Sequence, residues 1–170
     1  MKIAVISDTH RKFSLAKEAI DLLIEQGAEY LIHAGDICEY DTLEYIKNTN
    51  IPYVAVYGNN DAHMVQYHND FNLHKEPYYF KIEDVKFKLM HLPFYMTPDS
   101  DVVIFGHTHI FQVEQQNQTL FLNPGEVCAR EKPLSECVLL EITDTKFVVQ
   151  YFAKDIKTNI IQEKLYEFKR

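Results

Sequence analysis

The chain has 170 residues, 46% of them hydrophobic and 25% charged, and we expect residues 1–170 to form a single globular domain. Its net charge of −8 argues against non-specific binding to nucleic acid, which depends on lysine and arginine contacts with phosphates. No apolar run approaches the roughly 18 residues that a membrane span needs, and a functional motif follows residues 1–6 directly, so we expect a cytoplasmic protein without a signal peptide or a membrane partner.

The first half of the chain alternates predicted strands with predicted helices. Apolar runs predict strands at residues 2–7, 30–33 and 52–56. Apolar positions at helical spacing predict a helix over residues 14–26, with Ser14 as its N-cap. Asp41 is the expected cap of a second helix that ends near residue 47. This order implies parallel strands joined by right-handed crossovers.

The second half is rich in predicted strands. Apolar runs on either side of short polar turns predict hairpins at residues 78–90, 111–122 and 137–152. Residues 101–105 form a further buried strand, and residues 154–170 have the mixed charge of a solvated strand and tail. The three cysteines are widely spaced and form no CxxC pair, which argues against a disulfide framework and a thiolate zinc site. The simplest fold is an α/β core with two sheets packed face to face.

Seven residues that can bind metals follow five of these apolar runs. They are Asp8 and His10, Asp36, Asn59, His91, and His107 and His109. Taken singly, most have an ordinary structural explanation: Asp36 could cap the following helix, and a lone His91 is more often a satisfied core residue. His107 and His109 are harder to dismiss, because two histidines at this spacing follow a buried strand.

The seven residues become informative as a set. Parallel strands place their carboxyl ends along one edge of a sheet, where α/β folds build their sites. Carboxylate oxygens and imidazole nitrogens suit cations such as Mn²⁺, Zn²⁺ and Fe²⁺. Two such cations side by side would favour hydrolysis of phosphate esters. We therefore interpret the set as a metal site rather than as a collection of structural residues.

The order of these motifs resembles the calcineurin-like metallophosphoesterase superfamily, and most of all its small bacterial and archaeal phosphodiesterase branch. DTH, GD, GNxD, a single His, GHTH and NPG follow one another between Asp8 and Gly125. The resemblance implies an α/β fold, a four-layer αββα sandwich of two mixed β-sheets flanked by helices. It also implies a hydrolase whose substrate is a phosphate-ester small molecule or a nucleotide-like molecule.

By motif position, the resemblance implies a binuclear centre in which Asp36 bridges the two cations. One cation would be held by Asp8, His10, Asp36 and His109, and the other by Asp36, Asn59, His91 and His107. A hydroxide that bridges the cations would attack phosphorus in line with the leaving oxygen. Manganese is the expected metal, with Zn²⁺, Fe²⁺, Ni²⁺ and Mg²⁺ as alternatives. The expected catalytic residues are Asp36, Asn59 and His63.

The sequence departs from the family pattern in ways that affect the chemistry. Asn60 stands where many members carry a histidine assigned as the proton donor, and an amide cannot act as a general acid. His63 is the candidate replacement, although it could equally be a surface histidine. Where relatives have His-Gly-His, this chain has a histidine followed by Leu92 and Pro93.

The interval between His91 and His107 holds only fifteen residues, where relatives place a helix. We expect a short loop there, which would leave one flank of the sheet barer and open to a partner subunit in a homo-oligomer. The alternative to an enzyme is a non-catalytic scaffold, because the retromer subunit of this fold serves chiefly as an interaction platform.

Overall fold

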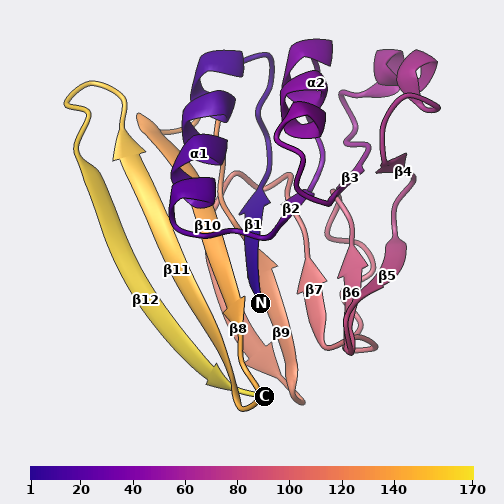
Figure 1. Ribbon diagram of the computed structural model, residues 1–170, viewed down its shortest axis with the longest axis vertical. Helices are drawn as coiled ribbons and strands as arrows, with labels where there is room; N and C mark the ends of the chain where they lie inside the picture. Colours follow the sequence, from indigo (N-terminus) through magenta and orange to yellow (C-terminus); the bar gives the residue numbers. More distant parts are fainter.

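Two β-sheets form the framework of the chain in the computed structural model, which describes residues 1–170 (Figure 1). The larger sheet contains β1 (Lys2–Ile6), β2 (Tyr30–His33), β3 (Tyr53–Val56), β4 (Leu73–His74), β10 (Leu134–Ile142), β11 (Lys146–Asp155) and β12 (Ile161–Lys169). The smaller sheet contains β5 (Tyr78–Ile82), β6 (Val85–Leu89), β7 (Val102–Ile104), β8 (Gln112–Gln116) and β9 (Thr119–Asn123). The helices are α1 (Phe13–Glu25), α2 (Tyr40–Asn48) and a 3₁₀ helix, η1 (Ala62–Tyr67).

Both sheets mix parallel and antiparallel pairs. The larger sheet has the order β12-β11-β10-β1-β2-β3-β4, and the smaller one β5-β6-β7-β9-β8. Strands β1 to β4 pair in parallel, whereas β10, β11 and β12 form an antiparallel ribbon at the other side of the sheet. In the smaller sheet β6, β7 and β9 are parallel. The two mixed sheets confirm the predicted α/β class.

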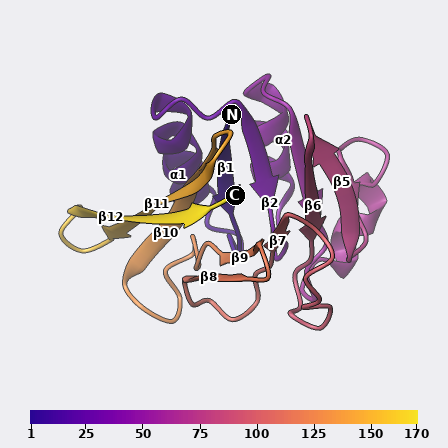
Figure 2. The ribbon, with the colours of Figure 1, turned by 90° about the horizontal axis from the view of Figure 1, so that it is seen from below.

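The main core lies between the sheets, and a second core lies under α1. In β1, Ile3 and Val5 belong to the inter-sheet core, whereas Ala4 and Ile6 belong to the core under the helix. Successive residues of a strand point to opposite faces, so this strand is apolar throughout because both of its faces are buried. Seen from below, β8 and β9 lie on the opposite side of β1 and β2 from α1 and α2 (Figure 2).

Both predicted helix caps are wrong, although both helices are present. Helix α1 begins earlier than predicted: its N-cap is Lys12, which makes no side-chain capping hydrogen bond, and Ser14 lies inside the first turn. The N-cap of α2 is Glu39, and Asp41 lies in the first turn. A carboxylate there is still favourable, because the free N–H groups and the dipole of the helix attract negative charge.

A loop, not a helix, covers the outer face of the smaller sheet, as the short interval after His91 predicted. No α-helix follows Asn48, so this layer is thinner than the four-layer pattern implies. The loop is anchored by Lys88, which is 0% exposed. Its Nζ donates hydrogen bonds to the carbonyl of Tyr95 (2.8 Å) and to Oγ1 of Thr97 (2.7 Å), and pairs with Asp99 (2.7 Å). The charge of Lys88 can be buried here because the loop supplies the hydrogen-bond and ion-pair partners that offset its loss of water.

The three cysteines, Cys38, Cys128 and Cys137, are buried and free, which confirms that the chain has no disulfide framework. Neither α-helix has the length and hydropathy required to cross a bilayer.

Candidate metal centre

The seven predicted ligands lie in loops that leave the carboxyl ends of five strands: Asp8 and His10 after β1, Asp36 after β2, Asn59 after β3, His91 after β6, and His107 and His109 after β7. Hydrogen bonds join these loops across the two sheets. The N–H of His107 donates to Oδ2 of Asp8 (3.1 Å), and Nδ1 of His91 donates to the carbonyl of Ala34 (2.8 Å). The carboxyl ends of both sheets therefore meet at a single edge.

The backbone at this edge adopts a conformation that L-residues rarely take. Five of the seven predicted ligands have positive φ: 54° at Asp8, 40° at His10, 55° at Asp36, 68° at His107 and 60° at His109. Each left-handed non-glycine residue costs on the order of 1–3 kcal/mol, and such residues concentrate at functional sites. This concentration of strain in the predicted ligands indicates that the side chains are held in place for a purpose other than stability.

Two glycines give the side chains room to converge. A Cβ atom on Gly35, whose φ is +90°, would lie 2.8 Å from the Cβ of His91. A Cβ atom on Gly58 would collide with the carboxylate of Asp36. Glycine is required at both positions because the backbone passes directly against a predicted ligand.

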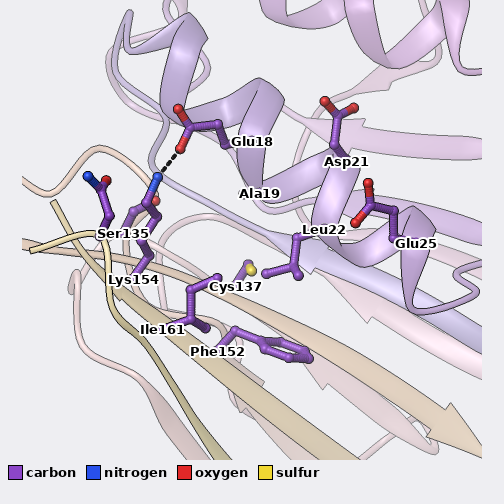
Figure 3. Close-up of a pocket in the computed structure, with 11 residues that line it drawn as sticks. Glu18, Ala19, Asp21, Leu22, Glu25, Ser135, Cys137, Phe152, Lys154 and Ile161 are labelled. Atoms are coloured by element: carbon purple, nitrogen blue, oxygen red, sulfur yellow. Dashed lines mark hydrogen bonds and ion pairs between the residues drawn. The ribbon is translucent and has the colours of Figure 1, made fainter.

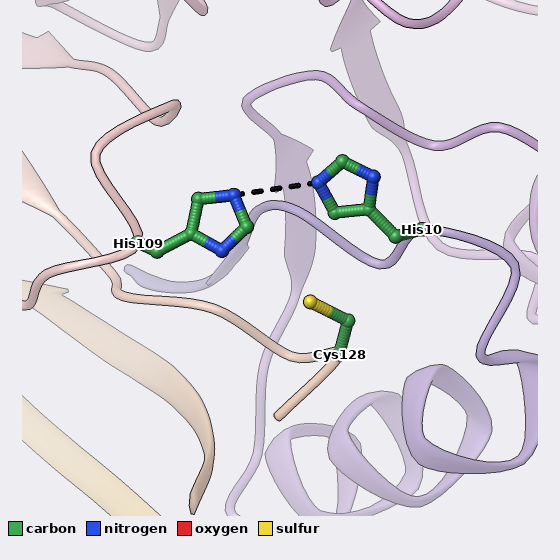
Figure 4. Close-up of side chains that lie close together, drawn as sticks. All are labelled: His10, His109 and Cys128. Atoms are coloured by element: carbon green, nitrogen blue, oxygen red, sulfur yellow. Dashed lines mark hydrogen bonds between the residues drawn. The ribbon is translucent and has the colours of Figure 1, made fainter. Parts of the chain in front are cut away.

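Four of the predicted ligands, Asp8, His10, Asp36 and His109, form one group. Oδ1 of Asp8 lies 3.2 Å from Nε2 of His109 and 3.6 Å from Nε2 of His10. The rings of His10 and His109 are stacked, with Nε2 atoms 3.4 Å apart (Figure 4). Nε2 of His10 is also 3.4 Å from Oδ2 of Asp36. The imidazole nitrogens and the two carboxylates thus face one small volume.

The remaining ligands lie on the other side of Asp36. Nε2 of His91 is 3.4 Å from Oδ2 of Asp36 and 3.0 Å from the amide oxygen of Asn59. The exposed ring of His107 meets the ring of His91 edge-on, with centroids 5.2 Å apart. One oxygen of Asp36 therefore faces both groups of ligands.

The buried polar atoms of this cluster fit a cation. Oδ1 of Asp8 is buried and has no hydrogen-bond partner. His91 uses Nδ1 to donate to the carbonyl of Ala34 (2.8 Å), and His109 uses Nδ1 to contact the carboxylate of Glu126 (2.5 Å). Metal-binding histidines are commonly held in this way through the nitrogen that does not bind the metal. Both rings thus present Nε2 to the cluster.

The carboxylates of the cluster stay ionised at neutral pH. Burial alone would raise the pKa of Asp8, but the nearby imidazoles of His10 and His109 outweigh burial and hold that pKa well below its ordinary value. Burial likewise opposes ionisation of Asp36, yet hydrogen bonds with His91 and Asn60 lower its pKa to about 2. Two ionised carboxylates buried in one cluster attract cations.

Sequence reasoning missed two buried acids that organise the loops. Glu126 is 0% exposed and, besides His109, accepts hydrogen bonds from the N–H groups of Glu131 (2.8 Å) and Lys132 (3.1 Å). Asp61, also 0% exposed, accepts hydrogen bonds from three N–H groups, those of residues 37, 38 and 58. The only sequence feature that pointed to these acids was their place in the motifs. Asp61 is the last residue of GNxD, and Glu126 directly follows NPG.

Two further residues determine the chemistry available beside Asp36. Asn60 donates from its backbone N–H to Oδ1 of Asp36 (2.9 Å) and from its side chain to Oδ2 (2.7 Å). His63 lies at the surface, with Nε2 3.0 Å from the carbonyl oxygen of Cys38. The Asn60 residue holds the carboxylate of Asp36, and the His63 ring makes no hydrogen bond to any of the seven predicted ligands.

A separate hollow of about 370 Å³ lies between α1 and the strands β10 to β12 (Figure 3). Helix α1 contributes Glu18, Asp21 and Glu25 to its lining, and Lys154 pairs with Glu18. This hollow contains no histidine, and its excess of carboxylates would repel a phosphate. The edge where the seven predicted ligands meet is therefore the better candidate for phosphate chemistry.

Comparisons with known proteins agree with this geometry. The phosphodiesterase MJ0936 of Methanocaldococcus jannaschii is 31% identical over 141 residues, which cover 75% of this chain and 85% of the relative. The structure of an archaeal phosphodiesterase matches with a TM-score of 0.76 and 26% identity, and the match covers 98% of this chain and 100% of that one. Vps29 of Entamoeba histolytica in complex with Zn²⁺ matches with a TM-score of 0.72 and 23% identity, over 98% of this chain and 99% of Vps29.

The family model described as the calcineurin-like phosphoesterase superfamily domain matches residues 1–145. These residues include all seven predicted ligands and the two buried acids, Asp61 and Glu126. The chain belongs to the calcineurin-like phosphoesterase superfamily.

Proposed function

We propose that the protein is a phosphodiesterase that uses two divalent cations. The observation that carries this proposal is the position of Asp36, whose Oδ2 lies 3.4 Å from Nε2 of His10 and 3.4 Å from Nε2 of His91. A single carboxylate between two sets of donors can join two cations. We assign one cation to Asp8, His10, Asp36 and His109, and the other to Asp36, Asn59, His91 and His107.

The donor set supports borderline divalent metals. Imidazole nitrogens with carboxylate and amide oxygens suit Mn²⁺, Zn²⁺ and Fe²⁺, and the set contains no thiolate that would select a softer ion. We propose Mn²⁺ first, and the Zn²⁺ in the related Vps29 structure supports zinc as an alternative. When bound, two cations would lower the pKa of a shared water that attacks phosphorus and would hold the phosphoryl oxygens.

Side chains around the centre would position the predicted ligands and the substrate. Asn60 fixes Asp36 through two hydrogen bonds, and Glu126 fixes His109. His107 has an exposed ring at the mouth of the site, where it can bind a cation and meet the substrate. His63 remains the candidate proton donor, and it would have to turn away from the carbonyl of Cys38 to reach a leaving group.

The test is hydrolysis of bis(p-nitrophenyl) phosphate by metal-stripped protein, with and without added Mn²⁺. Asp36→Asn removes the shared charge, and Asp144→Asn is the matched control because Asp144 is exposed in a turn. We expect turnover that requires Mn²⁺, persists in Asp144→Asn and is lost in Asp36→Asn. Folded protein that shows no turnover with any divalent metal would refute the proposal.

The competing function is a non-catalytic scaffold, which the structural likeness to Vps29 favours. The loop over the smaller sheet exposes Phe94 (75%) and Tyr95 (52%), and apolar side chains of this kind suit contact with another protein or a second copy of the chain. A degenerate scaffold has no need for buried carboxylates that converge with histidines at one edge of the sheets. If hydrolysis is absent, Phe94→Ser should weaken the binding of that other protein or of a second copy of the chain.

A further inference from the structure

The surface beside His10 is hollowed in two places, and neither hollow contains an acidic residue. The smaller hollow, of about 240 Å³, is lined by His10, Arg11, Cys38, Asn60 and Arg130. The larger, of about 420 Å³, shares His10 and Arg130 with it and adds Lys12. In a chain with a net charge of −8, this is a local reversal of charge at the mouth of the candidate centre. It favours a substrate that carries negative charge beyond the phosphate being attacked.

Both arginines can reach such a charge. The guanidinium of Arg130 extends to the centre, with Nη2 3.2 Å from Nε2 of His109. Its Nε pairs with the exposed carboxylate of Glu131 (3.2 Å), and the Arg130 side chain remains 53% exposed. Arg11 is anchored through Nε to the carbonyl of Cys38 (3.2 Å), so its terminal nitrogens stay free to donate. Guanidinium groups bind phosphate oxygens through paired hydrogen bonds and keep their charge at every physiological pH.

The same hollow offers poor proton donors to a leaving group. Asn60 occupies it in place of an acid, and its amide already donates to Asp36. The other lining groups are the proposed ligand His10, the buried thiol of Cys38 and the two arginines. An alkoxide leaving group needs a proton in the transition state. A phosphate leaving group does not, because it departs as a stable anion that guanidinium groups can hold.

We propose that the substrates of this site are diesters of diphosphate, in which the departing group is itself a phosphate monoester held by Arg11 and Arg130. This inference rests on the proposed function, because it names the substrate class of the same centre. The oxygen of a water forms a bond to one phosphorus, and the bridging P–O bond on that phosphorus breaks. The electron pair of that bond stays on the departing phosphate, and the water releases its proton to solvent, so no general acid is required.

The experiment compares two substrates that differ in the leaving group and share their adenine bases. Diadenosine diphosphate yields two molecules of AMP, whereas the dinucleotide deoxyadenylyl-deoxyadenosine must release an alkoxide. With Mn²⁺-loaded protein, we expect kcat/KM to favour diadenosine diphosphate by at least roughly 100-fold, the smaller part of what a general acid usually contributes. Each of Arg11→Gln and Arg130→Gln should lower kcat/KM for this substrate by roughly 10- to 100-fold.

The controls separate this inference from the proposed function. Lys164→Gln removes one positive charge from the exposed strand β12 and should leave both rates unchanged. Hydrolysis of bis(p-nitrophenyl) phosphate is measured beside the two adenosine substrates. If that diester is cleaved but diadenosine diphosphate is not, or if the arginine variants slow both equally, the inference is overturned and the proposed function stands. If no diester is cleaved with any metal, the proposed function fails and the inference fails with it.

Discussion

Glu126 is expected to set the metal affinity of the centre without touching the metal. Its Oε2 contacts Nδ1 of His109 (2.5 Å) and accepts from the thiol of Cys128 (3.2 Å), while its Oε1 accepts from two backbone N–H groups (2.8 and 3.1 Å). Both oxygens are therefore acceptors. In Glu126→Gln the amide NH₂ must face either Nδ1 of His109 or the two backbone N–H groups. In both orientations a hydrogen-bond donor faces another donor, and the hydrogen bonds on that side are lost in a fully buried position.

Two magnitudes follow from these contacts. Loss of the outer hydrogen bond to a metal-binding histidine typically lowers metal affinity by ~10- to 100-fold, or about 1.4–2.7 kcal/mol. Loss of a hydrogen bond to a buried charged group also costs about 1.5–3 kcal/mol of stability in the metal-free protein. The assays are calorimetric titration of metal-stripped Glu126→Gln with Mn²⁺ and its unfolding in urea.

Glu163→Gln is the matched control, because Glu163 is exposed on β12 and should leave both quantities unchanged. If Glu126→Gln bound Mn²⁺ as tightly as the wild type while remaining folded, the reasoning that Glu126 positions His109 would be refuted.

Three further outcomes follow from the buried polar groups. Asp61→Asn should lower the free energy of unfolding in urea by about 1–3 kcal/mol. The reason is that an amide supplies only one acceptor oxygen, whereas the two oxygens of Asp61 accept hydrogen bonds from three N–H groups. An unchanged midpoint of the urea unfolding curve would contradict this prediction. Lys88→Met should release the loop at residues 90–101. Chymotrypsin should then cleave at the exposed Phe94 at least roughly tenfold faster than in the wild type. Equal cleavage rates would show that Lys88 does not anchor the loop. Burial raises the pKa of the Cys137 thiol from 9.0 to about 12, so the unfolded thiol ionises first and stability should fall between about pH 9 and pH 12, by up to about 1.4 kcal/mol per pH unit. In Cys137→Ala the free energy of unfolding should fall less steeply over this pH range. If its pH dependence ran parallel to that of the wild type, the loss of stability would not come from the Cys137 thiol.

The clustering of the seven predicted ligands at one edge could be predicted because their signals are local. Each follows an apolar run, and parallel strands bring their carboxyl ends together whatever the details of packing. The strand at residues 2–6 shows why the elements were also predictable: it is apolar on both faces, and both faces are buried. The helix caps failed because α1 begins after a turn built on positive φ at His10 and Arg11, which residue type alone does not indicate.

The polar groups that hold the centre could not be predicted, because their partners are distant in the sequence. Lys88 alternates with Phe87 and Leu89 along β6, a pattern that predicts a lysine in solvent. It does point away from the inter-sheet core, but the loop after His91 folds over it and buries it. Glu126 likewise reads as part of a tight turn, and its role depends on His109 and on backbone groups that only the folded chain brings near.

The most direct test of the binuclear account is anomalous diffraction from crystals of the protein soaked in Mn²⁺. The account predicts two peaks, one on each side of Asp36, within coordination distance of its carboxylate. One peak should be surrounded by Asp8, His10 and His109, and the other by Asn59, His91 and His107. A single peak, or two peaks that do not share Asp36, would contradict the central claim.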